Sequence, residues 1–283
     1  MKTKLGLTLA IAALAACWLA GPPGSAGIPR PSFILYGQAA DEYGWPYTAE
    51  AVVTLWINER SFETYAVSGM VTPGVNFVFR VALDGGGVGL PIDPMAAHTG
   101  DTFRITVSAF GEEKTLVPTM PFPKVGQPGE IIRINLTAGV DSNANGLPDE
   151  WEQWIVDHAN NPVIKTIADV EPGDDADGDG VSNLQEYLAG TDPANAYDCF
   201  LIDQWEKCAN GRLRLEFLTV PGKTYALLAA PLLAGPPYLW EPCPFAQSPT
   251  GAMSSVPIIG TGHYLSLFVE GRSPAHIFRV QVK

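Results

Sequence analysis

The sequence has few basic residues and lacks the common signatures of catalysis and zinc binding. It carries 17 Lys and Arg against 30 Asp and Glu, a net charge of −13. We do not expect so acidic a chain to bind nucleic acid through phosphate contacts. It has no Gly-x-Ser-x-Gly, His-Glu-x-x-His or phosphate-loop motif, and its four histidines are scattered. We therefore predict no catalytic residues and a protein that is not an enzyme. No Cys-x-x-Cys pair offers zinc ligands.

Long hydrophobic runs are missing after the N-terminus. Two lysines precede an apolar run over residues 5–20, which is shorter than the ~20 residues of a membrane span and is followed by small residues. This order is typical of a secretory signal peptide, residues 1–26, cleaved after Ala26. The alternative is a lipoprotein signal, residues 1–16, with the lipid on Cys17. The sequence thus predicts a secreted or cell-envelope protein that contacts a membrane only through a lipid on Cys17.

Cysteine is scarce as well. Besides Cys17, the chain has Cys199, Cys208 and Cys243. Export makes disulfides accessible, and three thiols allow one bridge and one leftover. The spacing leaves the pairing open, with Cys199 and Cys208 as the nearest pair in sequence.

The composition is rich in turn-forming residues, with 29 Gly and 25 Pro. Apolar and polar residues alternate with a period of two in residues 28–139 and again in residues 196–283. This pattern predicts a mainly β fold, with two small β-sandwich domains joined by the segment 140–195. Strands are expected at residues 51–57, 62–67, 76–82, 102–109, 130–136, 212–220, 224–229, 264–269 and 276–282.

The entry to the first domain has a distinctive turn. Asp41, Gly44 and Pro46 form an Asp-x-x-Gly-x-Pro motif before the alternating residues 51–55. This stretch resembles the opening of carboxypeptidase-regulatory-like β-sandwiches, although residues 49–50 depart from the small pair usual there. The resemblance implies a non-catalytic spacer or adhesion module.

Three aromatic residues alternate through the same turn: Tyr43, Trp45 and Tyr47. One interpretation is an aromatic platform for a sugar ring. The other is that all three close the turn and cap the core, as aromatic residues of β modules mostly do.

The middle segment carries thirteen Asp and Glu and one Lys, and so nearly all of the net charge. Two stretches in it fit the twelve-residue calcium loop, which has oxygen ligands at positions 1, 3, 5 and 9, a backbone carbonyl ligand at 7, Gly at 6 and Glu at 12. An acidic linker is the alternative, but a linker needs no Gly at position 6. The predicted ligands of two Ca²⁺ ions are Asp141, Asn143, Asn145, Leu147, Asp149 and Glu152 in loop one, and Asp175, Asp177, Asp179, Val181, Asn183 and Glu186 in loop two.

Helical spacing follows each loop, and the two apolar stripes are expected to pack on each other, with Leu147 and Val181 pointing into the same core. Loop one has Asn at positions 3 and 5, so it has fewer charged ligands and is expected to be the weaker site. The stripes consist of Trp151, Trp154 and Ile155 after loop one and of Leu184, Tyr187 and Leu188 after loop two.

Loop two and the Gly-Thr-Asp-Pro of residues 190–193 resemble the bacterial thrombospondin type 3 calcium repeat. That resemblance implies a further ligand at Asp192. Loop one lacks this ending, and residues 130–136 before it are strand-like. The segment is therefore EF-hand-like without being a full EF-hand pair, which has a helix before each loop.

These observations together predict a secreted or envelope-associated, calcium-binding modular protein that is not an enzyme. Calcium would stiffen an interdomain joint for a structural or adhesion role, and the partner would be a cell-envelope or extracellular protein or a glycan. One alternative is a dockerin-like adaptor, against which stand Glu at position 12 and the internal location. Another is a carbohydrate-binding accessory module, which depends on the aromatic residues of the first turn.

Overall fold

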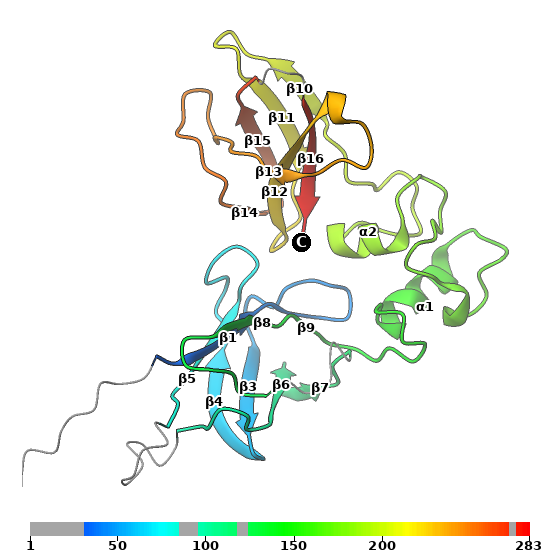
Figure 1. The fold of residues 1–283 in the computed structure, drawn as a ribbon. Coiled ribbons are helices and arrows are strands. Elements are labelled where there is room, and N and C mark those ends of the chain that lie inside the picture. Colours follow the sequence, from blue (N-terminus) through cyan, green and yellow to red (C-terminus); the bar gives the residue numbers. More distant parts are fainter. Residues whose placement is uncertain (1–30, 85–95, 118–123, 272–275) are drawn as a thin grey trace, which may run out of the picture.

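The computed structural model describes residues 31–84, 96–117, 124–271 and 276–283. It is mainly β, which confirms the predicted fold class. The predicted signal peptide and Cys17 lie outside the described residues. Figure 1 shows an N-terminal β module and a C-terminal β module, with two helices beside the place where the modules approach each other. Among the described residues, no helix is both long and apolar enough to span a membrane.

The N-terminal module consists of two sheets that face each other and a short parallel pair. One sheet has the order β5-β1-β8, the other has the order β4-β3-β6-β7, and β2 pairs with β9. The strands are β1 (Phe33–Gly37), β2 (Ala39–Ala40), β3 (Ala51–Ile57), β4 (Arg60–Ala66), β5 (Phe77–Val81), β6 (Phe103–Ala109), β7 (Glu112–Lys114), β8 (Ile131–Arg133) and β9 (Leu136–Thr137).

Alternation along the strands builds the core of this module. In β3, every second residue from Ala51 to Ile57 is buried, while the residues between them are partly exposed. Phe33 of β1 and Phe77 of β5 are fully buried and belong to the same hydrophobic cluster as Leu55 of β3. The side chains of both sheets therefore meet in one core, as expected of a β-sandwich.

The C-terminal module repeats this design. One sheet has the order β10-β11-β15, and in the other β12 pairs with β13, β14 and β16. Phe217 of β11, Leu267 of β15 and Leu227 of β12 share a second hydrophobic cluster. The strands are β10 (Gln204–Lys207), β11 (Leu213–Leu218), β12 (Thr224–Pro231), β13 (Glu241–Pro242), β14 (Ile258–Ile259), β15 (Tyr264–Val269) and β16 (His276–Val282), with a short 3-10 helix η2 (Leu232–Ala234).

The three cysteines of the C-terminal half are free thiols, so the one bridge that they allow is not formed. Cys243 is fully buried in the core of the C-terminal module. Cys199 and Cys208 are partly exposed.

The predicted strand over residues 130–136 is divided into β8 and β9. The backbone N–H of Ile134 still donates to Tyr36 (2.9 Å), and that of Leu136 donates to Gln38 (2.8 Å). At the division, the Asn135 side chain accepts from the backbone N–H of Gln38 (3.3 Å). A side chain thus takes the place of one backbone partner, and the ladder is interrupted.

The acidic segment contains the two helices, α1 (Asp149–His158) and α2 (Asn183–Ala189), with a 3-10 turn η1 (Ile167–Asp169) between them. Its own small core includes Leu147, Trp151, Ile155 and Tyr187. The rings of Trp151 and Tyr187 meet edge to face, with centroids 5.4 Å apart. The two helices therefore contact each other through this aromatic pair.

Half of the predicted apolar stripes lie outside that core. Trp154 is 40% exposed, and Leu184 and Leu188 are each 42% exposed. The prediction that the two stripes pack on each other therefore holds for Trp151, Ile155 and Tyr187 and is wrong for the other three residues. With only ten and seven residues, the helices are too short to bury every residue of a stripe at one crossing. Of the two position 7 residues, Leu147 is fully buried, whereas Val181 is partly exposed.

Candidate metal centre

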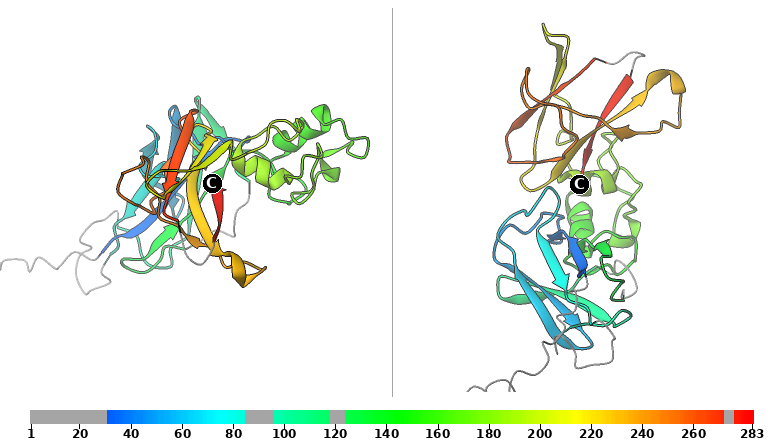
Figure 2. Two further views of the ribbon diagram at one scale, coloured as in Figure 1. Left: turned by 90° about the horizontal axis from the view of Figure 1, so that it is seen from above. Right: turned by 60° about the vertical axis from the view of Figure 1, so that its left-hand side comes forward.

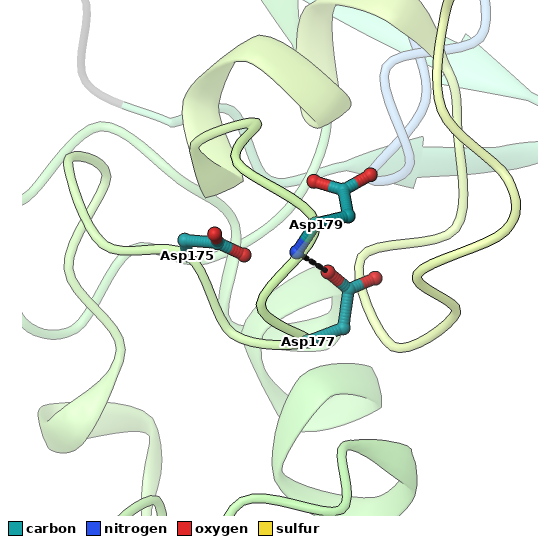
Figure 3. A group of neighbouring side chains, drawn as sticks. All are labelled: Asp175, Asp177 and Asp179. Carbon is teal, nitrogen blue, oxygen red and sulfur yellow. Dashed lines mark hydrogen bonds between the residues drawn. The ribbon is translucent and has the colours of Figure 1, made fainter.

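Loop two brings three carboxylates together. Asp175, Asp177 and Asp179 each place one oxygen within 4.8 Å of the others (Figure 3). The Asp175 side chain accepts the backbone N–H groups of Gly178 (2.7 Å) and Gly180 (2.8 Å). Gly180 has a φ of +95°, a conformation that other residues rarely adopt. The backbone of the loop thus holds its own carboxylates in place.

Glu186 supplies a fourth carboxylate from α2. Its side chain is 0% exposed. One oxygen each of Asp177, Asp179 and Glu186 is buried without a hydrogen-bond partner in the described part of the chain. A buried carboxylate oxygen without a donor is costly, and acidic groups this close repel one another. Three carboxylates with unpaired oxygens, together with the Asp175 carboxylate beside them, fit a hard cation such as Ca²⁺.

The pKa shifts in loop two also support a cation site. Burial raises the pKa of Glu186 to about 8, and repulsion by Asp177 and Asp179 contributes to this rise. Burial also raises the pKa of Asp177, again with repulsion from its acidic neighbours. A bound cation would remove this repulsion and favour the ionised carboxylates.

Loop one has the same spacing but a different interior. The side-chain amide of Asn143 donates to Glu152 (3.0 Å), and that of Asn145 donates to the same carboxylate (2.6 Å). Glu152 is 0% exposed, like Glu186. Because two amides already donate hydrogen bonds to this carboxylate, a cation would have to displace their N–H groups and turn their oxygens inward. Loop one is therefore less suited than loop two to bind a cation.

The side chains at position 9 bind the backbone at position 2 in both loops. Asp149 accepts from the backbone N–H of Ser142 (2.7 Å), and Asn183 accepts from that of Ala176 (3.2 Å). Asn183 also donates to the carbonyl of Glu171 (2.8 Å). In this arrangement the two side chains close the loops, and a water molecule could connect each of them to an ion, as is common at position 9.

The structure places Asp192 against α1. The indole N–H of Trp154 donates to its carboxylate at 3.0 Å, and the backbone N–H of Ala194 donates to the same oxygen at 3.2 Å. Among the described residues, the acidic group with metal-binding geometry consists of Asp175, Asp177 and Asp179 and includes neither Glu186 nor Asp192. The position of Asp192 therefore favours a link between α1 and the end of α2.

Next to Glu186, Tyr187 connects the helical segment to both β modules. Its carbonyl accepts a hydrogen bond from the ammonium group of Lys223 (3.0 Å), in the turn before β12. On the other side, a methyl group at residue 44 would lie 3.0 Å from the Cζ atom of Tyr187. Figure 2 shows α2 beside the meeting point of the two modules. Sequence reasoning missed Lys223, because a single lysine in a Pro-Gly turn looks like a solvated surface residue.

Because Lys223 is buried, we expect the free energy of unfolding to rise at alkaline pH. Its side chain is 3% exposed, and burial lowers its pKa from 10.5 to about 8. Between these values the unfolded chain binds more protons than the folded one, so the free energy of unfolding increases with pH, by about 3 kcal/mol from this group. Denaturant unfolding from pH 8 to 10.5 measures this increase. The Lys223→Met variant should lack it, and an equal increase in that variant would contradict the assignment.

No protein-family model, curated protein or solved structure matches this chain. The resemblances of its motifs to calcium repeats and to β-sandwich modules therefore stay at the level of motifs. The case for a metal centre depends on the residues of loop two and their geometry.

Proposed function

We propose that this chain is a calcium-binding modular protein, without catalytic activity, in which an ion in loop two rigidifies the joint between two β modules. A structural or adhesion role in the envelope or outside the cell follows from that design. The observation that supports it most is the group of unpaired, buried carboxylate oxygens in loop two, one of which belongs to the residue directly before Tyr187.

The route from the ion to the C-terminal module is short. Glu186 lies in the first turns of α2, so an ion that binds its carboxylate connects this helix to the aspartates of the loop. Lys223 then donates to the carbonyl of Tyr187 close to the end of the helix, where a cation also complements the helix dipole. Two successive residues thus connect the proposed ion to the C-terminal module.

The N-terminal module packs on the same residue. The turn at Gly44 has so little space beside the Tyr187 ring that a side chain there would clash. Pro46 of this module and Gly222 of the C-terminal module also lie close, because a methyl group at residue 222 would be 3.4 Å from the proline ring. A fixed orientation of α2 therefore restrains both modules.

Calcium in such a joint would be structural. Extracellular calcium modules bind with dissociation constants of about 10⁻⁴–10⁻³ M. At these affinities the site is filled where calcium is abundant, and it does not respond to small changes. Loop one, in which amides already satisfy Glu152, would add a weaker second ion.

Small-angle scattering of the full chain tests the joint. We expect calcium to narrow the distribution of interdomain distances relative to a chelator-treated sample. The variant Lys223→Glu should lose this narrowing, because a carboxylate would repel the Tyr187 carbonyl and the nearby Asp41. Its matched control is Lys207→Glu, the same charge reversal at an exposed position of β10.

Calorimetry shows whether Lys223→Glu still binds calcium. If it does, the loss of narrowing results from the missing contact at Tyr187 and not from the loss of the ion. Identical scattering of the wild-type protein with and without calcium would overturn the proposed joint. Loss of the narrowing in Lys207→Glu to the same extent would also count against it.

One observation favours a second function, the dockerin-like adaptor. Leu184 and Leu188 lie one turn apart on α2, and each is 42% exposed. An adaptor would use such an apolar pair to contact a partner, whereas the joint uses Tyr187 and the end of the helix. The internal position of the segment, between two β modules, is better suited to the joint.

A further inference from the structure

A cavity of about 340 Å³ lies where the N-terminal module meets the helical segment. Tyr43 and Trp45 line it from the turn between β2 and β3, and Trp154 lines it from α1. Each of these three aromatic side chains is 40% exposed, while Trp151 beside them is only 4% exposed. Rings from two modules thus surround one hollow of a size that suits a small ligand.

The turn fixes the first two rings. The Asp41 carboxylate accepts the backbone N–H groups of Tyr43 (3.0 Å) and Trp45 (2.8 Å), and Gly44 takes a φ of +76°. Tyr47, the third residue of the alternation, is buried in the sandwich core at 7% exposure. The turn therefore divides the three aromatic residues, with two at the cavity and one in the core.

The side chain of Trp154 is also fixed in position by its contacts. Its indole N–H donates to Asp192 (3.0 Å), and its ring stacks on His158 with centroids 3.8 Å apart. Rings that are already ordered lose little conformational entropy when a ligand binds. Exposed and rigid aromatic faces are characteristic of a recognition surface.

The charged groups of the cavity are two carboxylates. Asp192 has one carboxylate oxygen bound to Trp154, and Asp198 has one bound to the backbone N–H of Asp192 (3.0 Å). The second oxygen of each carboxylate has no donor within the described part of the chain. Among the described residues that line the cavity, none is basic. A ligand that offers hydrogen-bond donors and an apolar face, and that carries no negative charge, therefore suits this cavity.

We propose that this cavity binds a neutral saccharide. The C–H face of a sugar ring would stack on the exposed aromatic rings, and its hydroxyl groups would donate to the carboxylates of Asp192 and Asp198. Uronates and sulfated sugars would be repelled by the same carboxylates. A quaternary ammonium group also suits aromatic rings and carboxylates, but it has no N–H or O–H to donate, so it is the competing ligand that the test must include. The saccharide site goes beyond the calcium joint and does not depend on it.

Binding of the purified full chain to immobilised neutral oligosaccharides tests the site, with heparin and polygalacturonate as anionic probes and phosphocholine as the cationic one. All measurements use the same millimolar calcium buffer. Calorimetry then gives the affinity for the best neutral sugar. We expect Trp45→Ala to weaken this affinity at least about tenfold, and Asp198→Asn to weaken it as well.

The matched control is Trp205→Ala, which removes an indole that is 73% exposed on β10 and away from the cavity. It should change the affinity by less than about twofold. Unchanged thermal unfolding of Trp45→Ala would confirm that the loss is local. The proposal is overturned if no neutral sugar binds at about 10 mM. Equal losses in Trp45→Ala and Trp205→Ala, or preferred binding of phosphocholine, would overturn it too.

Discussion

Replacement of Glu186 by glutamine is expected to weaken calcium binding at the proposed site in loop two by roughly two orders of magnitude, about 2.7 kcal/mol. The amide keeps the shape of the side chain but removes one of the four negative charges that face the proposed ion. Calorimetric titration of the chelator-stripped chain measures the change directly. The matched control is Glu152→Gln, the same substitution at position 12 of loop one, which should affect only the weaker site.

The stability of Glu186→Gln relative to the wild-type protein is a second test, because the difference is expected to depend on calcium. Without calcium, the variant should be more stable than the wild-type protein at pH 8, because it removes a buried charge whose pKa is raised to about 8. With calcium, the difference in stability should become smaller, since the wild-type site gains more binding energy than the variant. Thermal unfolding in chelator and in millimolar calcium shows both. Wild-type protein that binds no calcium at about 10 mM would refute the metal centre.

Replacement of Tyr187 by alanine is expected to lower the free energy of unfolding by about 3–5 kcal/mol, as for other large aromatic residues in a core. Tyr187 is 8% exposed and packs edge to face on Trp151. It also packs against the turn at Gly44. The control is Tyr264→Ala in β15, where the side chain is 61% exposed and the loss should stay within about 0.5 kcal/mol.

Tyr187→Ala should also separate the unfolding of the modules. In the wild-type protein with calcium we expect one transition, because the helical segment contacts both modules. In the variant, calorimetry should resolve at least two transitions, since the ring contact with the N-terminal module is gone while the backbone carbonyl that Lys223 binds remains. A single transition at a lower temperature would indicate a role in the small helical core alone, and it would argue against a joint at this residue.

Local patterns account for most of the β fold and for the candidate site. The alternation at residues 51–57 predicts β3 with its observed bounds, because a strand that buries one face must repeat every two residues. The acidic cluster of loop two was also predictable. Its three aspartates and its glycine lie within six consecutive residues, so the backbone turn alone brings the carboxylates together.

The interior of loop one could not be predicted from the spacing of its residues. Its spacing equals that of loop two, yet the amides of Asn143 and Asn145 turn toward Glu152 and satisfy that carboxylate. Spacing specifies which residues can face the interior of a loop. Which atom of an amide points inward depends on the charges that it meets there.

The alternation of residues by itself was enough to predict a mainly β chain, and the spacing of oxygen-bearing residues was enough to predict the acidic cluster of loop two. Only the tertiary structure decided that Tyr47 is buried while Trp45 faces a cavity, and that Lys223 lies against the end of α2. Lys223 and Tyr187 are 36 residues apart, a distance that no local period spans. Contacts between modules depend on how separately folded surfaces fit together, and the periodicity of one strand or helix holds no information on that fit.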